Sequence, residues 1–212
     1  MYNRSVAVDY LPELPLAMPG EPGPWRLPDY LALPDEPRCE LLQGLLVVTP
    51  APSLAHQLVS MVVGDVLLRH ARAIGGRALA APVDVVLSES TVVQPDLLLL
   101  TPERLDRAGD RVTGAPDLVV EIVSPGSARR DRLWKLELYR RTDVREYWIV
   151  DPAERTGEFL LLRDGRFELA AVADERYLSP TFAGLDLDLA ALWRELADPR
   201  AGAGGASRGS PG

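Results

Sequence analysis

Two acidic residues stand within otherwise apolar stretches of the sequence. Asp96 lies in residues 92–100 (VVQPDLLLL), and Glu121 lies in residues 117–124 (DLVVEIVS). Both stretches are typical of β-strands, where a buried carboxylate is costly unless it has a partner. The partner of each acid could be an arginine in a structural ion pair, but two acids on successive strands favour a shared cation. Because Mg²⁺ is bound through few carboxylates together with water, we predict that Asp96 and Glu121 bind Mg²⁺, with Mn²⁺ as an alternative.

Lys135 is the only lysine among 23 basic residues, since arginine fills every other basic position. Lysine differs from arginine in being a compact point charge with an adjustable pKa. Lys135 follows Asp131 by one helical turn in a helix predicted over residues 128–141, so one interpretation is a surface salt bridge worth about 0.3–0.5 kcal/mol. The other interpretation, which we favour, is that Lys135 reaches back over the sheet towards Glu121. On either interpretation, Lys135→Arg is expected to leave folding almost unchanged.

Two acids, a metal ion and a lysine together are typical of phosphodiester hydrolysis. A metal ion polarises the phosphate and lowers the pKa of a bound water. A lysine can orient that water or neutralise charge that develops on the phosphate. The sequence therefore predicts metal-dependent phosphodiester hydrolysis with Asp96, Glu121 and Lys135 as catalytic residues.

The overall charge of the chain argues against a general electrostatic hold on nucleic acid. The formal net charge is −8 at pH 7, whereas a basic domain would be expected. A catalytically silent domain that binds nucleic acid or a protein therefore stays open as the alternative function. A two-carboxylate glycosidase is disfavoured, since that chemistry needs no lysine. Positive charge could still gather locally, at a candidate cluster formed by Arg129, Arg130, Arg132, Lys135, Arg140 and Arg141.

Length and composition favour one folded domain with tails. The chain has 212 residues, of which 47% are hydrophobic, and a single cysteine, Cys39, which excludes an intrachain disulfide. Because no apolar run is long enough to cross a bilayer and the first residues lack a signal-peptide pattern, we expect a cytoplasmic protein. Composition predicts a Pro-rich arm over residues 1–27, one domain over residues 28–195, and a disordered tail over residues 196–212.

The apolar pattern between these tails predicts an α/β fold in which helices flank a mixed β-sheet. Turn signals such as Asp164-Gly165 separate the elements. In chain order, we expect a short helix at 28–33, a hairpin at 41–48, a helix at 53–74, strands at 82–87, 92–100 and 118–123, a helix at 128–141, a strand at 146–150, a hairpin at 159–170, and a closing helix at 187–196.

Several stretches resemble the Uma-two family of the PD-(D/E)XK nuclease superfamily, whose members are classed as restriction endonucleases. These stretches are CELLQGLLVVTPAPSLAHQ, VVQPDLLLL, PDLVVEIVSPGSARRDRLWKLELYRRTDVREYWIVDP and FAGLDLDLAALW. The resemblance covers roughly residues 28–195, and its most specific part is the block at residues 116–152. It implies a restriction-endonuclease-like core in which Asp96 and Glu121 bind the metal ion, and a metal-dependent endonuclease for which DNA is favoured over RNA as the substrate.

The chain departs from the plain superfamily motif after the second acid. Val123 stands two residues after Glu121, where the motif has lysine. In the resembled family the lysine comes from the following helix, and Lys135 occupies the matching position. A second departure is Asp143, which stands where the family usually has glycine. Aspartate tolerates the left-handed conformation, so only a small loss of stability is expected there.

The resemblance also draws attention to polar residues outside the motif. Superfamily nucleases often add an acid from the N-terminal segment, which implies Glu40 as a further catalytic residue, although a solvated turn residue is an equal alternative. His56 is interpreted first as a helix cap or surface residue and second as a contact to phosphate or water. Asp84 could line the site, and Tyr139 is expected only as a core or supporting residue. The resemblance further allows a homodimer, but no segment identifies an interface.

Overall fold

The computed structural model of the protein describes residues 23–34, 36–49, 51–124 and 130–197, with the backbone alone at 130 and 131. The predictions for residues 1–22 and 198–212 lie outside these ranges. The backbone N–H of Gly23 donates to the Gln43 carbonyl, and that of Trp25 donates to the Gly44 carbonyl. Contacts of the folded domain therefore begin several residues before residue 28, and its last helix ends at Ala197.

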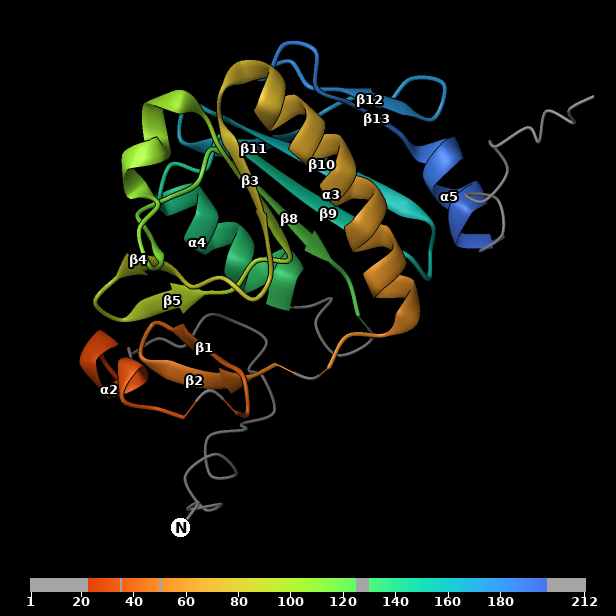
Figure 1. Cartoon of the computed structure of the whole chain (residues 1–212). Helices are drawn as coiled ribbons and strands as arrows, with labels where there is room; N and C mark the ends of the chain where they lie inside the picture. Colours follow the sequence, from red (N-terminus) through yellow and green to blue (C-terminus); the bar gives the residue numbers. More distant parts are fainter. Residues whose placement is uncertain (1–22, 35, 50, 125–129, 198–212) are drawn as a thin grey trace, which may run out of the picture.

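A six-stranded sheet forms the centre of the molecule (Figure 1). Strands β8 and β9 at its middle run parallel, and every other neighbouring pair in this sheet runs antiparallel. From one edge to the other, the strands are β11 (Arg166–Leu169), β10 (Thr156–Arg163), β9 (Glu146–Asp151), β8 (Leu118–Ile122), β6 (Leu97–Leu100) and β3 (Arg77–Ala80).

A second, five-stranded sheet packs near one end of the first. Its strands, in order, are β2 (Leu45–Val48), β1 (Cys39–Leu42), β5 (Thr91–Val93), β4 (Val85–Ser88) and β7 (Val112–Thr113). The β1–β2 pair confirms the hairpin predicted at 41–48. Helix α2 (Leu27–Leu31) packs on this sheet through Tyr30, and a 3-10 helix (Pro102–Arg107) follows β6. Strands β12 (Arg176–Leu178) and β13 (Asp186–Asp188) form a separate pair.

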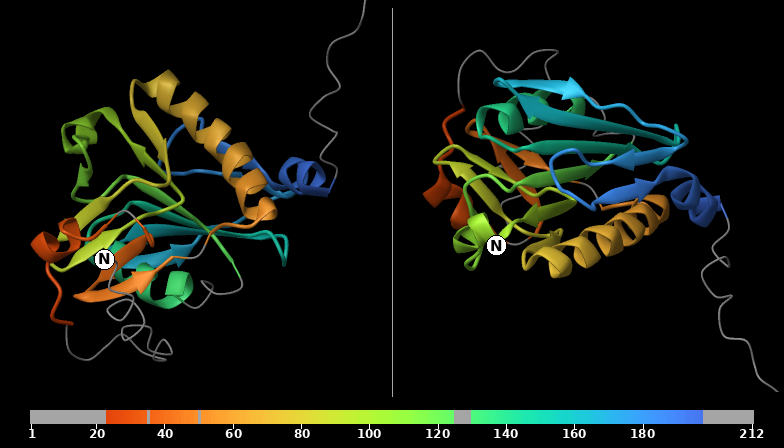
Figure 2. Two further views of the ribbon diagram at one scale, coloured as in Figure 1. Left: turned by 60° about the horizontal axis from the view of Figure 1, so that its bottom comes forward. Right: turned by 90° about the horizontal axis from the view of Figure 1, so that it is seen from above.

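The long helix α3 (Leu54–Ile74) covers one face of the six-stranded sheet together with α5 (Leu189–Ala197), and α4 (Leu136–Arg141) lies on the other face (Figure 2). The hydroxyl of Ser53 caps the start of α3 by accepting the His56 N–H. Gly75 ends it in the left-handed conformation, with a φ of 74°. These local signals explain why the predicted helix at 53–74 is confirmed. None of the described helices is both long and apolar enough to span a membrane.

The strand predicted at 92–100 is two strands in two different sheets. Strand β5 ends at Val93 in the five-stranded sheet, and β6 begins at Leu97 in the six-stranded sheet. Pro95 lies between them and has no N–H to donate to a sheet ladder, so the chain leaves one sheet there and joins the other. The prediction of one continuous strand was wrong, and Asp96 lies in the crossing, directly before the first residue of β6.

The helix predicted at 128–141 also differs from a regular helix. A turn of π-helix occupies Arg130–Lys135 and continues into α4, while residues 125–129 lie outside the described part. Such π-turns are rare and are frequent at functional sites. The hairpin predicted around Asp164-Gly165 is confirmed, with both residues at positive φ (49° and 74°) as a two-residue turn requires. Asp143 adopts a φ of 66°, the left-handed conformation that was expected there.

Candidate active site

Lys135 lies at the centre of a buried ionic group on the α4 side of the six-stranded sheet. Its ammonium Nζ is 2.8 Å from Oε1 of Glu40 and 2.8 Å from Oε1 of Glu121. The exposed side-chain fractions are 2% for Lys135, 1% for Glu40 and 5% for Glu121. Lys135 therefore reaches Glu121, as favoured from the sequence.

This burial corrects three expectations. Lys135 is not a surface residue, so the interpretation as a weak surface salt bridge is wrong; the side chain of Asp131 lies outside the described part. Glu40 is not a solvated turn residue, because it lies within β1 and contacts the ammonium. The expectation that Lys135→Arg would leave folding almost unchanged assumed an exposed pair, and the burial of Lys135 removes that assumption. A bulkier guanidinium would have to fit a closed space between two carboxylates, so we now expect a loss of stability.

Two further donors hold the glutamates of this group. The Tyr139 hydroxyl donates to Oε1 of Glu121 at 2.7 Å, and the Gln94 backbone N–H donates to Oε1 of Glu40 at 2.8 Å. Complete burial beside Glu121 raises the pKa of Tyr139 well above its ordinary value, so its hydroxyl stays a donor. Tyr139 follows Lys135 by four residues, a spacing that places both on one helical face and could have indicated its role. Gln94 contributes through its backbone, which no side-chain pattern signals.

Asp96 and His56 form a second, more open half of the site. Nε2 of His56 lies 3.1 Å from Oδ2 of Asp96, and the Ile122 N–H donates to the same oxygen at 2.6 Å. The exposed side-chain fractions are 12% for His56 and 19% for Asp96. The side chain of His56 is thus neither a helix cap nor a free surface group; it comes from the first turn of α3 to contact the candidate metal ligand.

The two halves adjoin because of how β6 and β8 pair. Leu97 lies opposite Val120, so Asp96 and Glu121 are the next positions at the same end of this strand pair. The Ile122 N–H, directly after Glu121, binds the Asp96 carboxylate. Leu97 and Val120 belong to the core under α3, while Val119 belongs to the core beside α4. The ends of β6 and β8 thus bring together Asp96, which is contacted from α3, and Glu121, which is contacted from the π-turn and α4.

Asp84 lies next to this site and contacts one of the residues that bind Glu40. Its Oδ1 accepts the Tyr30 hydroxyl at 2.8 Å and the Gln94 side-chain amide at 2.9 Å. The backbone N–H of Gln94 binds Glu40, so Gln94 connects Asp84 to the buried ionic group. The role of Asp84, ranked below Glu40 from the sequence, stays a prediction.

The donor set of the site suits Mg²⁺ or Mn²⁺. Glu40 and Glu121 contact Lys135, and Asp96 lies beside Glu121 at the end of the β6–β8 pair. The oxygens of these three carboxyl groups are the hard ligands that such cations prefer. Among the described residues, no group of three or more His, Cys, Asp or Glu side chains is arranged to hold a metal ion. Mg²⁺ requires only one or two carboxylates when water and substrate phosphate complete its shell, so the residues fit a site of two protein ligands. Whether Asp96 and Glu121 share one cation stays a prediction.

The candidate basic cluster is not a free positive surface. Arg132 pairs with Asp151 and Glu158, and both Arg140 and Arg141 pair with Glu137. Lys135 is buried, and the side chains of Arg129 and Arg130 lie outside the described part. Most of these charges are therefore already compensated within the protein.

Comparison with known proteins identifies the family. Residues 27–190 match the model of the Uma2 family, described as "Putative restriction endonuclease". The chain belongs to the Uma2 family. The matched region contains both halves of the site, and the family resemblance seen in the sequence is confirmed. No curated protein matches the chain by sequence.

A solved structure confirms the fold of this Uma2 protein. The crystal structure of a "putative nuclease belonging to DUF820" from Anabaena variabilis ATCC 29413 superposes with a TM-score of 0.71. The two proteins are 22% identical, over 82% of this chain and 99% of the other. At this identity the likeness establishes the fold, an α/β arrangement of mixed sheets flanked by helices, as predicted. The family assignment supports a nuclease function in general terms.

Proposed function

We propose that this Uma2 protein is a metal-dependent endonuclease that hydrolyses phosphodiester bonds of DNA. The observation that carries the proposal is the junction of the buried Glu40–Lys135–Glu121 group with the more exposed Asp96 carboxylate at one end of β6 and β8. Asp96 and Glu121 would hold Mg²⁺ or Mn²⁺. When bound, the metal ion supplies Lewis-acid stabilisation of the phosphate and a water of lowered pKa.

The chain's own residues orient these two ligands. His56 and the Ile122 N–H both bind Oδ2 of Asp96, which fixes the direction of that carboxylate. Lys135 and Tyr139 both bind Oε1 of Glu121. Preorganised groups of this kind contribute more in a buried site than in water, because they need no reorganisation during the reaction.

Lys135 has a second role in this proposal. Its ammonium supplies the positive charge of the buried group and lies beside a proposed metal ligand, where it stabilises negative charge that develops on the phosphate. Glu40 holds the ammonium from the other side at 2.8 Å, so the lysine cannot swing away from Glu121 without breaking an ion pair. Hydrolysis adds water across one P–O bond, which leaves a phosphate on one fragment and a hydroxyl on the other.

The test incubates the full chain with supercoiled plasmid, linear duplex DNA, single-stranded DNA or RNA. Each substrate is tested in EDTA, Mg²⁺ and Mn²⁺, and cleavage is measured. We expect DNA cleavage only with metal, and a loss of about 10²-fold or more in Asp96→Asn. Asp186→Asn is the matched control, because Asp186 pairs with Arg176 on the surface of β13. Isothermal titration with Mn²⁺ should detect binding to the wild type and to the control, and weaker binding to Asp96→Asn.

Two results would contradict this proposal. Nucleic-acid binding without cleavage of any substrate, unaffected by Asp96→Asn, would favour the catalytically silent domain instead. Cleavage of RNA alone would overturn the choice of DNA. The cytoplasmic location stays a prediction.

A further inference from the structure

Helix α3 is apolar on two opposite faces. Val59, Val63 and Leu67 on the inner face are fully buried against the six-stranded sheet. On the outer face, Leu54 is 77% exposed, Met61 is 71% exposed and Leu68 is 37% exposed. These three residues are seven positions apart, so they form one stripe along the helix. A helix at the surface of a monomer normally carries polar residues on its outer face, and this stripe therefore indicates a covering partner.

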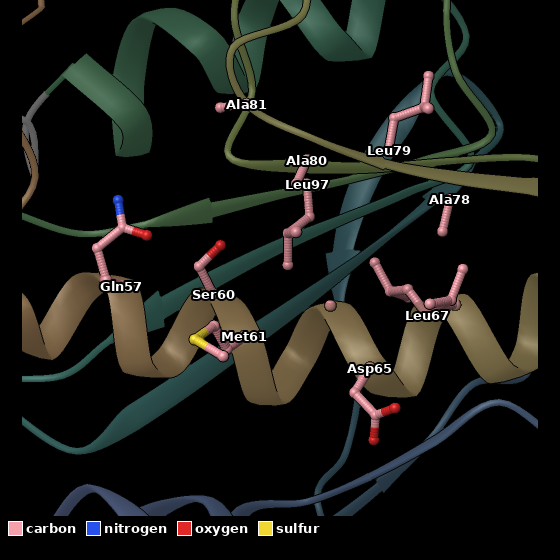
Figure 3. A pocket seen from close by; sticks show the side chains of 12 residues that line it. Gln57, Ser60, Met61, Asp65, Leu67, Ala78, Leu79, Ala80, Ala81 and Leu97 are labelled. Carbon is pink, nitrogen blue, oxygen red and sulfur yellow. The ribbon is translucent and has the colours of Figure 1, made fainter.

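The surface beside this stripe is hollowed and ends at an edge strand of the six-stranded sheet. A groove of about 420 Å³ runs between α3 and β3, and its lining includes Met61, Gly64 and Leu68. In Figure 3 the side chains of Gln57 and Ser60 extend from α3 towards Ala80 and Ala81. Strand β3 is the edge of the six-stranded sheet. The stripe and the groove together make a continuous, mostly apolar surface.

We infer that a second copy of this chain covers the stripe, with the two α3 helices packed antiparallel about a two-fold axis at Met61. The stripe is symmetrical about this residue. Reversing the helix places Leu54 of one copy opposite Leu68 of the other and Met61 opposite itself. A two-fold interface uses the same patch on both copies, and a stripe of this symmetry is self-complementary.

The facing surfaces of the two α3 helices are also complementary in shape when they pair about Met61. Leu58 precedes Met61 by three residues and Gly64 follows it by three, so Leu58 of one helix faces Gly64 of the other. A side chain built on Gly64 would meet Leu97 at 3.3 Å, so it is the lack of a side chain at this position that keeps the groove open. A large residue opposite a small one is the knob-into-hole packing that lets two helices approach to about 8–10 Å.

Charge is also complementary. Asp65 and Gln57 lie four residues on either side of Met61. The Asp65 carboxylate, which pairs with Arg69 on its own helix, would therefore also face the Gln57 amide in the first turn of the other helix. That first turn contains no acidic residue. A carboxylate is favoured there because the start of a helix carries partial positive charge.

The pairing has a consequence that rests on the proposed function. His56 precedes Met61 by five residues, so the two His56 residues would be offset by about 15 Å along the paired helices, and the distance between the helices adds to this. Because His56 turns to Asp96 on the inner side of α3, the two candidate active sites would be held in a fixed relation on either side of the helix pair. The oligomeric state itself is measured without substrate, so it can fail or hold independently of the nuclease proposal.

The first test is sedimentation of the full chain without nucleic acid. We expect a concentration-dependent dimer, and Met61→Arg should raise its dissociation constant by about 30-fold or more, since it places two cations at the axis. Leu169→Arg is the matched control, because Leu169 is 68% exposed on β11, at the opposite edge of the sheet from β3. Both variants should melt near the wild-type temperature. A monomer at all concentrations, or a dimer that Met61→Arg leaves intact, would overturn the inference.

The second test measures the direction of pairing. In a Cys39→Ser background, spin labels at Met61→Cys should lie close together, across helices about 8–10 Å apart. Labels at Arg72→Cys should be separated by about 33 Å, because Arg72 lies eleven residues from the axis in each copy. Short distances at both positions would mean parallel helices and would contradict the two-fold arrangement.

Discussion

Two glutamates are buried on neighbouring parallel strands of the same sheet, Glu121 in β8 and Glu146 in β9. The exposed fraction of the whole residue is 3% for Glu121 and 0% for Glu146. Their surroundings differ in kind. Glu121 faces a lysine, a tyrosine and a second acid, and the two donors meet on one oxygen, Oε1. Glu146 is bound by neutral donors that divide between both of its oxygens: Ser179 and Thr181 on Oε1, and Trp148 and Tyr177 on Oε2.

The comparison distinguishes a structural carboxylate from a candidate catalytic one. Hydrogen bonds on both oxygens offset the desolvation of Glu146 and attach the β12 region to the central sheet. Burial beside Glu146 raises the pKa of Tyr177, which keeps its hydroxyl a donor. Glu121 instead belongs to a group with excess acid that adjoins a partly exposed carboxylate, Asp96. Burial alone therefore does not distinguish the two glutamates, whereas the charge of their partners does.

The largest contrast is expected between Glu121→Gln and Glu146→Gln. Glu121→Gln should lower metal-dependent cleavage by about 10³-fold, because it removes a proposed ligand. Glu146→Gln should leave the cleavage rate of the folded protein unchanged and lower the free energy of unfolding by about 1–3 kcal/mol. Single-turnover rates and urea denaturation of both variants measure the two effects. Equal losses of cleavage in both variants would remove the distinction.

Lys135→Arg should have the next largest effect. Cleavage should fall by about 10²-fold, since a guanidinium keeps the charge but not the size or hydration of the ammonium. Because Lys135 is buried, the free energy of unfolding should also fall by about 1–3 kcal/mol, the usual range for overpacking. Arg132→Lys on the same π-turn is the control, and it should cleave at a near-normal rate. Wild-type cleavage by Lys135→Arg would show that Lys135 has only a structural role.

The two tyrosines that bind these glutamates offer a finer test. Tyr139→Phe removes one hydrogen bond to Glu121, and cleavage should fall by about 10-fold, the equivalent of about 1.4 kcal/mol. Tyr177→Phe removes the corresponding bond to Glu146 and should lower the melting temperature without changing cleavage. A Tyr139→Phe variant that loses stability but keeps its full cleavage rate at low Mn²⁺ would argue against a role in orienting Glu121.

Substitution of Glu137, a carboxylate near the surface, should have the smallest effect on stability. Hydrogen bonding to Arg140, opposed in part by desolvation and reinforced by Arg141, lowers the pKa of Glu137 from 4.5 to about 2. Because the folded pKa is depressed, the stabilisation is present above pH 4.5 and is lost as the pH falls towards 2. Glu137→Gln should therefore melt slightly below the wild type at neutral pH, and the difference should vanish near pH 2. A difference that is constant with pH would contradict this assignment.

Local patterns in the sequence determined much of the framework. Alternating apolar residues located β8 and its acid, the Ser53 cap and Gly75 delimited α3, and Asp164-Gly165 placed a hairpin turn. The single lysine in an arginine-rich chain pointed to Lys135. These features could be predicted because each depends on residues within a few positions of one another, where strand and helix periodicities apply.

Tertiary structure decided how the site is assembled. Glu40 and Gln94 are separated by 54 residues and meet through a backbone N–H, and His56 reaches Asp96 from another element. The break at Pro95 also depends on tertiary structure, because only the pairing of strands in the two sheets shows that residues 92–100 divide between them. No local periodicity encodes such contacts. Whether a carboxylate is buried against a cation, a neutral donor or water depends on which distant segment packs on it, and that is settled only when the sheets and helices close around one core.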